Sequence, residues 1–166
     1  MPQDKTLDDL FLDTLKDIYF AEKQILKALP KMAKAAEDPQ LKAGFEEHRD
    51  QTEQHVERLE QIFEMLDKPA RGKTCEAILG IIGEGEEIMD DFKGTHALDA
   101  GLISAAQAVE HYEMARYGTL KTWANLLGRK DAAALLEATY KEELETDKKL
   151  TQLAVGNDNS KAAAAA

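Results

Sequence analysis

The sequence contains little of several residue types, and each shortage excludes a class of protein. Cys75 is the only cysteine among 166 residues, which excludes a disulfide framework within the chain and favours a reducing compartment. No apolar run approaches the roughly 18 residues that a membrane-spanning helix requires. The acidic start, MPQDKTLDDLF, lacks the basic and then apolar order of a signal peptide. We therefore expect a soluble, cytoplasmic protein.

Basic residues are also scarce. The chain has 21 lysines and arginines against 32 aspartates and glutamates, which gives a formal net charge of −11. Because binding to phosphate groups requires a basic face, this balance argues against nucleic acid and against an anionic membrane surface as partners. Hydrophobic residues make up 43% of the chain, enough for one folded domain with a core.

Aromatic residues amount to only 6%, and there are four prolines, a balance typical of all-α proteins. Apolar residues recur with helical period, and Thr6, Asp38-Pro39 and Gly128 are typical helix-end residues. The sequence thus predicts an all-α bundle of four long helices in up-down hairpins, with a short helix in the crossover connection. The domain covers 1–156, and 157–166 form a disordered tail. The expected helices cover about 6–32, 39–68, 74–89, 99–127 and 131–156.

The two halves of the chain resemble each other at one fixed offset. Glu22 aligns with Glu113, and 113 − 22 = 91. One offset that serves both pairs of long helices predicts two related helical hairpins around a pseudo-twofold axis, although chance overlap of helical patterns remains an alternative. The same offset relates Leu29 to Leu120, Phe45 to Leu136, Thr52 to Glu143, His55 to Thr146 and Leu59 to Leu150.

Acidic and imidazole side chains lie in register with the apolar stripes of the four long helices. Glu22, for example, follows Ile18 and precedes Ile25 by about one turn, so it is expected to point inward. Unpaired carboxylates in a core cost several kcal/mol per charge, so something must neutralise them. Carboxylates with a few imidazoles suit iron(II) or manganese(II), and bundles hold such ions in dimetal sites. The candidate metal ligands are Glu22, His48, Gln51, His55, Glu110, Glu113, Glu143 and Asp147.

Each of these residues also has a simpler explanation. A single glutamate such as Glu22 is commonly a boundary residue that extends to water, and His55 alone is more simply a packed histidine. His111 is expected on the surface and Glu142 to be solvated. Tyr117 is expected to pack in the core, with a place near a metal, one turn beyond Glu113, as the alternative. Independent accidents would not place such groups on all four helices, so the set as a whole favours a metal site.

Four segments carry a resemblance to a known family. They are DIYFAEKQILKALPKMA from Asp17, HRDQTEQHVERLEQIF from His48, DAGLISAAQAVEHYEMARYGTL from Asp99 and EELETDKKLTQLA from Glu142. Together they resemble the bacterial YciE/YciF family of ferritin-like stress proteins over nearly the whole chain up to the tail. The resemblance implies a ferritin-like bundle, a homodimer and a candidate di-iron centre.

The resemblance also assigns residues. The acidic positions of the family fall on Glu22, Glu110, Glu113 and Glu143, with Glu142 and Asp147 as further candidates. His48 matches a recurring histidine, and Gln51 stands where a glutamate can occur. The chain departs from the wider ferritin-like pattern of Glu-x-x-His on two helices, because it has Thr52-x-x-His55 and Glu143-x-x-Thr146. Mononuclear, dinuclear and weakly occupied sites therefore all stay open.

Two functions from different classes follow. The first is a ferroxidase-type protein that binds iron, or alternatively manganese, and oxidises iron(II) with O₂ or peroxide. The second is a non-catalytic, dimeric stress or structural protein with a vestigial metal site. Oxygen chemistry on an organic substrate cannot be separated from the first function by sequence. For the homodimer, the short helix with Ile78, Ile81 and Ile82 is the candidate interface.

Overall fold

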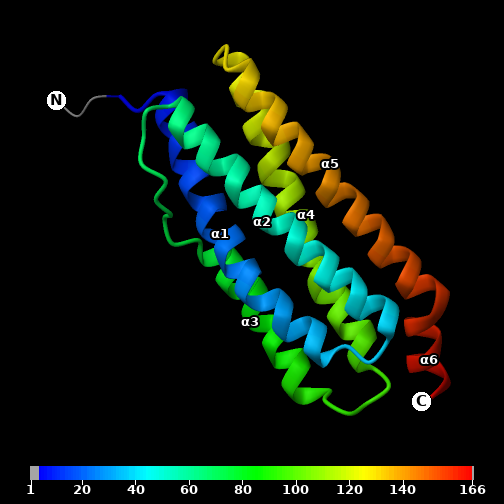
Figure 1. Cartoon of the computed structure of the whole chain (residues 1–166). Coiled ribbons are helices and arrows are strands. Elements are labelled where there is room, and N and C mark those ends of the chain that lie inside the picture. Colours follow the sequence, from blue (N-terminus) through cyan, green and yellow to red (C-terminus); the bar gives the residue numbers. More distant parts are fainter. Residues whose placement is uncertain (1–3, 166) are drawn as a thin grey trace.

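The computed structural model describes residues 4–165, without the side chain of Asn157. These residues form only helices and the segments that connect them. Four long helices run along a common axis, and the described part of the chain begins and finishes at opposite ends of the bundle (Figure 1). The predicted all-α, ferritin-like bundle with an extra short helix is therefore confirmed. The helices are α1 (Leu7–Ala35), α2 (Pro39–Met65), α3 (Glu76–Asp91), α4 (Leu98–Leu126), α5 (Lys130–Leu153) and α6 (Asn159–Ala164), with a π-helical turn, η1 (Ala154–Asp158), before α6. No helix within residues 4–165 is long and apolar enough to cross a membrane.

Local signals determine where these helices begin and end. At the start of α1 the Thr6 backbone N–H donates to Asp9 Oδ2 at 2.8 Å, while the Asp9 N–H donates to Thr6 Oγ1 at 3.3 Å, which forms a capping box. Asp38 Oδ1 accepts from the Gln40 N–H at 2.8 Å and caps α2. After α4, Gly128 adopts a φ of 72°, the left-handed conformation that glycine tolerates best. Pro30 lies inside α1, which nevertheless continues to Ala35.

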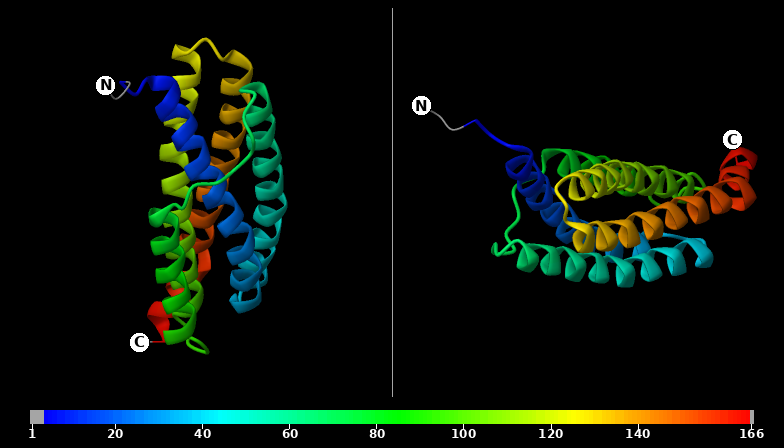
Figure 2. Two further views of the ribbon diagram at one scale, coloured as in Figure 1. Left: turned by 90° about the vertical axis from the view of Figure 1, so that its left-hand side faces the viewer. Right: turned by 90° about the horizontal axis from the view of Figure 1, so that it is seen from above.

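The helix bounds repeat at the offset found in the sequence. Helix α1 begins at Leu7 and α4 at Leu98, and 98 − 7 = 91; α2 begins at Pro39 and α5 at Lys130, and 130 − 39 = 91. Helix α1 packs on α2 and α4 packs on α5, and these two hairpins face each other through α1–α4 and α2–α5 contacts (Figure 2). The repeated pattern therefore corresponds to two hairpins whose helices begin at equivalent positions.

Helix α3 lies in the long connection between the hairpins and packs on α4 and α1. Close approach to α4 depends on Gly101, because a Cβ there would stand 2.6 Å from Ile88 Cγ2. Ile78 on α3 is completely buried, so it serves the core rather than the surface interface that its apolar sequence suggested. Ile81 and Ile82 are partly buried.

The end of the chain differs from the expected disordered tail at 157–166. Residues 154–164 are helical, and Asp158 is only 2% exposed. The alanine-rich end has a high helix propensity, and contacts of η1 and α6 with α4 add the packing that a short helix needs. Residue 166, which the expected tail included, and residues 1–3 of the expected domain lie outside the described part of the chain.

Candidate metal centre

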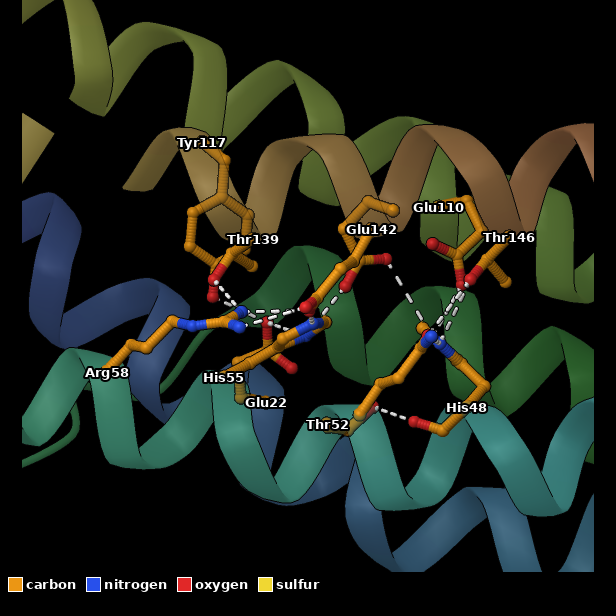
Figure 3. Close-up of polar contacts among 12 residues, drawn as sticks. Glu22, His48, Thr52, His55, Arg58, Glu110, Tyr117, Thr139, Glu142 and Thr146 are labelled. Carbon is orange, nitrogen blue, oxygen red and sulfur yellow. Dashed lines mark hydrogen bonds and ion pairs between the residues drawn. The ribbon is translucent and has the colours of Figure 1, made fainter. Parts of the chain in front are cut away.

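The four long helices bring six of the predicted ligands together in the middle of the bundle. Glu22 comes from α1, His48 and His55 from α2, Glu110 and Glu113 from α4, and Glu143 from α5. None of the six side chains is more than 4% exposed. Figure 3 shows Glu22, His48, His55 and Glu110 converging from their helices toward one region.

These side chains form two groups that share one carboxylate. Ligand atoms of His48, Glu110, Glu113 and Glu143 all lie within 4.8 Å of one another, and so do those of Glu22, His55 and Glu143. Glu143 Oε1 is 2.8 Å from His55 Nδ1, whereas Glu143 Oε2 is 3.8 Å from His48 Nε2. A carboxylate with one oxygen toward each group has the geometry of a bridging ligand.

Many ligand atoms of the site are buried without a hydrogen-bond partner. This holds for both oxygens of Glu113, for Oε2 of Glu143 and for one oxygen each of Glu22 and Glu110. The inward ring nitrogens of the two histidines are paired only with carboxylates of the site itself, His48 Nε2 with Glu110 Oε1 and His55 Nδ1 with Glu143 Oε1, each at 2.8 Å. Buried polar atoms are normally paired, because desolvation without a partner costs about 1–3 kcal/mol or more each. Convergent carboxylate oxygens without hydrogen-bond partners, together with two imidazoles that face them, are the donor set that a divalent cation would satisfy, so these residues fit a metal centre.

Burial and mutual repulsion shift the protonation of the carboxyl groups. Burial raises the pKa of Glu113 well above its ordinary value, and the neighbouring Glu143 and Glu22 raise it further. Burial likewise raises the pKa of Glu110 to about 7 and that of Glu143 to about 7. Without a cation, the site therefore holds protons near neutral pH that metal binding must release.

His55 is positioned by an ion pair on its far side. Its Nε2 lies 2.7 Å from Glu142 Oε2, and Glu142 in turn accepts two hydrogen bonds from the Arg58 guanidinium at 2.8 and 2.9 Å. Burial opposes a charge on His55, but hydrogen bonds to Glu142, Glu143 and Glu22 raise its pKa to about 12. With Glu142 on Nε2, the Nδ1 atom is left to face Glu22 and Glu143, the arrangement of a carboxylate that orients a metal-binding histidine.

His48 presents its other ring nitrogen, Nε2, to the centre. Its Nε2 lies 2.8 Å from Glu110 Oε1, whereas its Nδ1 faces Gln51 Oε1 at 3.5 Å and Thr146 Oγ1 at 3.4 Å. Thr146 occupies the place where the repeat would put a second histidine. His48, two turns before His55 on α2, supplies that imidazole from the neighbouring helix instead.

Two predicted ligands stand apart from these groups. Gln51 lies against the ring nitrogen of His48 that points away from the carboxylates. Asp147 is partly exposed and lies 3.3 Å from Nε2 of His111 on the surface. Among the described residues, Asp147 belongs to no group of histidine and carboxylate ligand atoms within 4.8 Å. The assignment of Gln51 and Asp147 as ligands stays a prediction.

Two contacts of the centre differ from the favoured expectation from the sequence. Arg58 holds Glu142, which was expected to be solvated. The Tyr117 hydroxyl, assigned to packing, donates to Glu22 Oε1 at 2.6 Å. Arg58 lies three residues after His55 and therefore on the same helix face, which is a signal that could have linked the two. Glu142, the partner of Arg58 on α5, could not be identified from helical spacing alone.

The fold and the centre define an all-helical protein with a buried carboxylate–histidine site between two hairpins. The chain belongs to the family described as "Domain of unknown function (DUF892)", whose pattern matches residues 6–163. It is 43% identical over 159 residues to Protein YciF of Escherichia coli strain K12, covering 95% of this chain and 96% of that protein. The predicted YciE/YciF resemblance is thereby confirmed.

Solved structures agree. The crystal structure of the E. coli stress protein YciF matches with a TM-score of 0.89 at 43% identity, over 93% of this chain and 98% of that one. YcfI of Rhodopseudomonas palustris, whose description suggests a structural role, matches with a TM-score of 0.87 at 43% identity, over 91% and 97% of the two chains. A Xanthomonas campestris protein at 21% identity has a TM-score of 0.74 over 93% and 94%, which shows a shared fold.

Proposed function

We propose that this protein binds two divalent metal ions between its hairpins, iron(II) or alternatively manganese(II), and acts as a ferroxidase in a cytoplasmic stress response. The observation that carries the proposal is the pair of buried ligand groups that share Glu143. Relationship to a stress protein supports the cellular setting, and the single, buried Cys75 suits a reducing compartment.

Two divalent ions satisfy the charge balance of the site without any proton in it. Glu22, Glu110, Glu113 and Glu143 carry four negative charges when ionised, and two divalent cations neutralise them with the histidines uncharged. A single divalent ion would neutralise two of them, and protons on the other carboxyl groups or on His55 would have to balance the rest, because uncompensated buried charge is costly. The absence of thiolate from both groups favours iron or manganese over zinc.

In the ferroxidase reaction iron(II) is the substrate. Two iron(II) ions each lose one electron, and one peroxide molecule takes up both electrons and two protons to become two water molecules; O₂ is the alternative oxidant. The carboxylates stabilise the higher positive charge of the product. Tyr117 holds Glu22 by its hydroxyl, and Arg58 with Glu142 holds His55, so both groups keep their geometry while the charge changes.

A non-catalytic structural protein is the second candidate. The description of the R. palustris relative favours it, and in that case the carboxylates would be a vestigial site. The proposed homodimer belongs to both candidates. Light scattering coupled to size-exclusion chromatography measures the oligomeric state directly. A monomer at all concentrations would remove the homodimer from both candidates.

Metal content separates the two candidates. We expect close to two irons per chain after anaerobic loading with iron(II), measured by elemental analysis, followed by oxidation on addition of peroxide or O₂. The variant Glu113→Gln keeps the side-chain volume but removes a ligand, and should lose most of the binding and the oxidation. Glu53→Gln, on the exposed face of α2, is the matched control. Absence of metal in the wild-type protein would favour the structural candidate.

A further inference from the structure

An apolar pocket connects the protein surface with the metal-binding residues. It has a volume of about 60 Å³ and is lined by side chains of all five helices from α1 to α5. Its walls include Leu29 of α1, Ile82 of α3, Val109 of α4 and Leu150 of α5, while His48 and Glu110 stand at its inner end. The pocket therefore opens onto one ligand group of the centre.

The apolar lining of the pocket favours an aliphatic group over water. A buried water needs roughly 10–15 Å³ and two to four polar partners, and the middle of this pocket offers aliphatic side chains instead. Besides Glu110, the charged residues of the lining are exposed at the outer end, where Lys31 pairs with Glu86 at 3.6 Å and Lys149 with Glu47 at 3.1 Å. Because these charges are paired with each other, the mouth does not select a charged ligand.

The inner end carries a set of loosely engaged neutral polar groups. The Gln51 amide oxygen, the Thr146 hydroxyl and Nδ1 of His48 lie 3.4 to 3.5 Å apart, at the long limit of hydrogen bonding. These three groups can accept a hydrogen bond from one polar group of a ligand or donate one to it. The neighbouring Glu110 and the net charge of −11 disfavour an anion. The complementary ligand has an aliphatic body and one uncharged polar end, as an aliphatic alcohol has.

Gly44 keeps part of this space open. It lies on α2 one turn before His48, so both residues share the face toward the pocket. A Cβ at Gly44 would meet no atom within 4 Å. Glycine inside a helix is less favourable than alanine, yet here any larger side chain would project into the pocket.

We propose that this pocket binds a small, uncharged, aliphatic molecule with one polar end and directs that end toward His48 and Glu110. The inference deepens the proposed function, on which it rests for the presence of metal at the inner end. A molecule of this class would be the organic substrate or ligand that the pocket brings to the centre. Binding itself requires only the pocket and is measurable in the metal-free protein.

The test uses straight-chain 1-alkanols with the full-length, metal-free protein. We expect saturable binding of 1-propanol by ligand-observed NMR, with affinity rising about fourfold for each CH₂ group added between methanol and 1-propanol, and no further gain once the pocket is filled. Gly44→Leu should weaken binding at least about tenfold without lowering the melting temperature. Gly80→Leu is the matched control, since Gly80 is also an open helical glycine but lies outside the pocket. Gly44→Ala, which adds one methyl group, should bind nearly normally.

Orientation is tested in the manganese(II)-loaded protein. Paramagnetic relaxation of the alkanol protons should be strongest at C1 and weakest at the terminal methyl group. Failure of every alkanol to bind, equal binding by Gly44→Leu and wild type, or the reverse relaxation gradient would overturn the inference. Alkanol binding by a protein that takes up no metal would instead leave the pocket assignment standing and remove the proposed ferroxidase function.

Discussion

Replacement of Glu110 by glutamine should stabilise the metal-free protein at alkaline pH and weaken the metal-loaded protein. Glu110 is 1% exposed, and its Oε2 has no hydrogen-bond partner. Burial raises its pKa from the ordinary 4.5 to about 7. Glutamine has nearly the same shape but no charge, so the variant removes the cost of ionisation in the core.

The magnitude follows from linkage. A group whose pKa is higher in the folded than in the unfolded state contributes stability below the unfolded value, and this contribution is lost as pH rises through the folded value. For Glu110 the loss extends from about pH 4.5 to about pH 7. A difference of about 2.5 pKa units corresponds to about 3 kcal/mol. For a chain of this length that is a melting-temperature difference of roughly 6–12 °C.

The assay is thermal unfolding in a chelating buffer at about pH 5 and about pH 8. We expect Glu110→Gln to melt close to wild type at the lower pH and clearly above it at the higher pH. Added manganese(II) should reverse the order, because the metal stabilises only a site with its full ligand set. Glu145→Gln, at an exposed position paired only with Lys148, should shift neither curve. A metal-free Glu110→Gln protein that melts below wild type at about pH 8 would refute the reasoning, because Glu110 would then be stabilised in its charged form.

Three further predictions concern the same centre. Metal affinity should fall as pH drops below about 7, where Glu110 and Glu143 take up protons; calorimetry in buffers of different ionisation enthalpy should show proton release on binding, and its absence would contradict protonated ligands. Arg58→Ala should weaken metal binding roughly 10–100-fold by releasing the partner of His55, with partial recovery in Arg58→Lys; unchanged titration curves would deny it a positioning role. Tyr117→Phe should lower the unfolding free energy by about 1–3 kcal/mol, because Glu22 loses a buried donor; denaturant titration measures this, and a neutral effect would mean that another group replaces the hydroxyl.

Much of the fold was predictable because its signals are local. The capping box at Thr6 and Asp9 and the Asp38-Pro39 start of α2 depend only on neighbouring residues. The inward register of Glu22 follows from helical periodicity in the same way. The tail was mistaken because a polar, alanine-rich segment shows no apolar stripe, while its helix is stabilised by α4.

The candidate site was predictable only in part. Residues such as Glu113 could be identified because a charge inside an apolar stripe requires compensation whatever the neighbouring helices are. Gln51 and Asp147 satisfy the same spacing rule but lie beside the centre. Helical spacing defines a face to within about one residue, and a ligand position must be correct within a fraction of an ångström.

The sequence by itself determined that this protein is a helical bundle with carboxylates and histidines directed inward from four helices. Only the tertiary structure decided that Glu143 stands between His48 and His55, that Arg58 fixes His55 through Glu142, and that an apolar pocket ends at the centre. These features depend on the axial shift and rotation of each helix against its neighbours. Packing of side chains distant in the sequence sets both quantities, and no local pattern contains them.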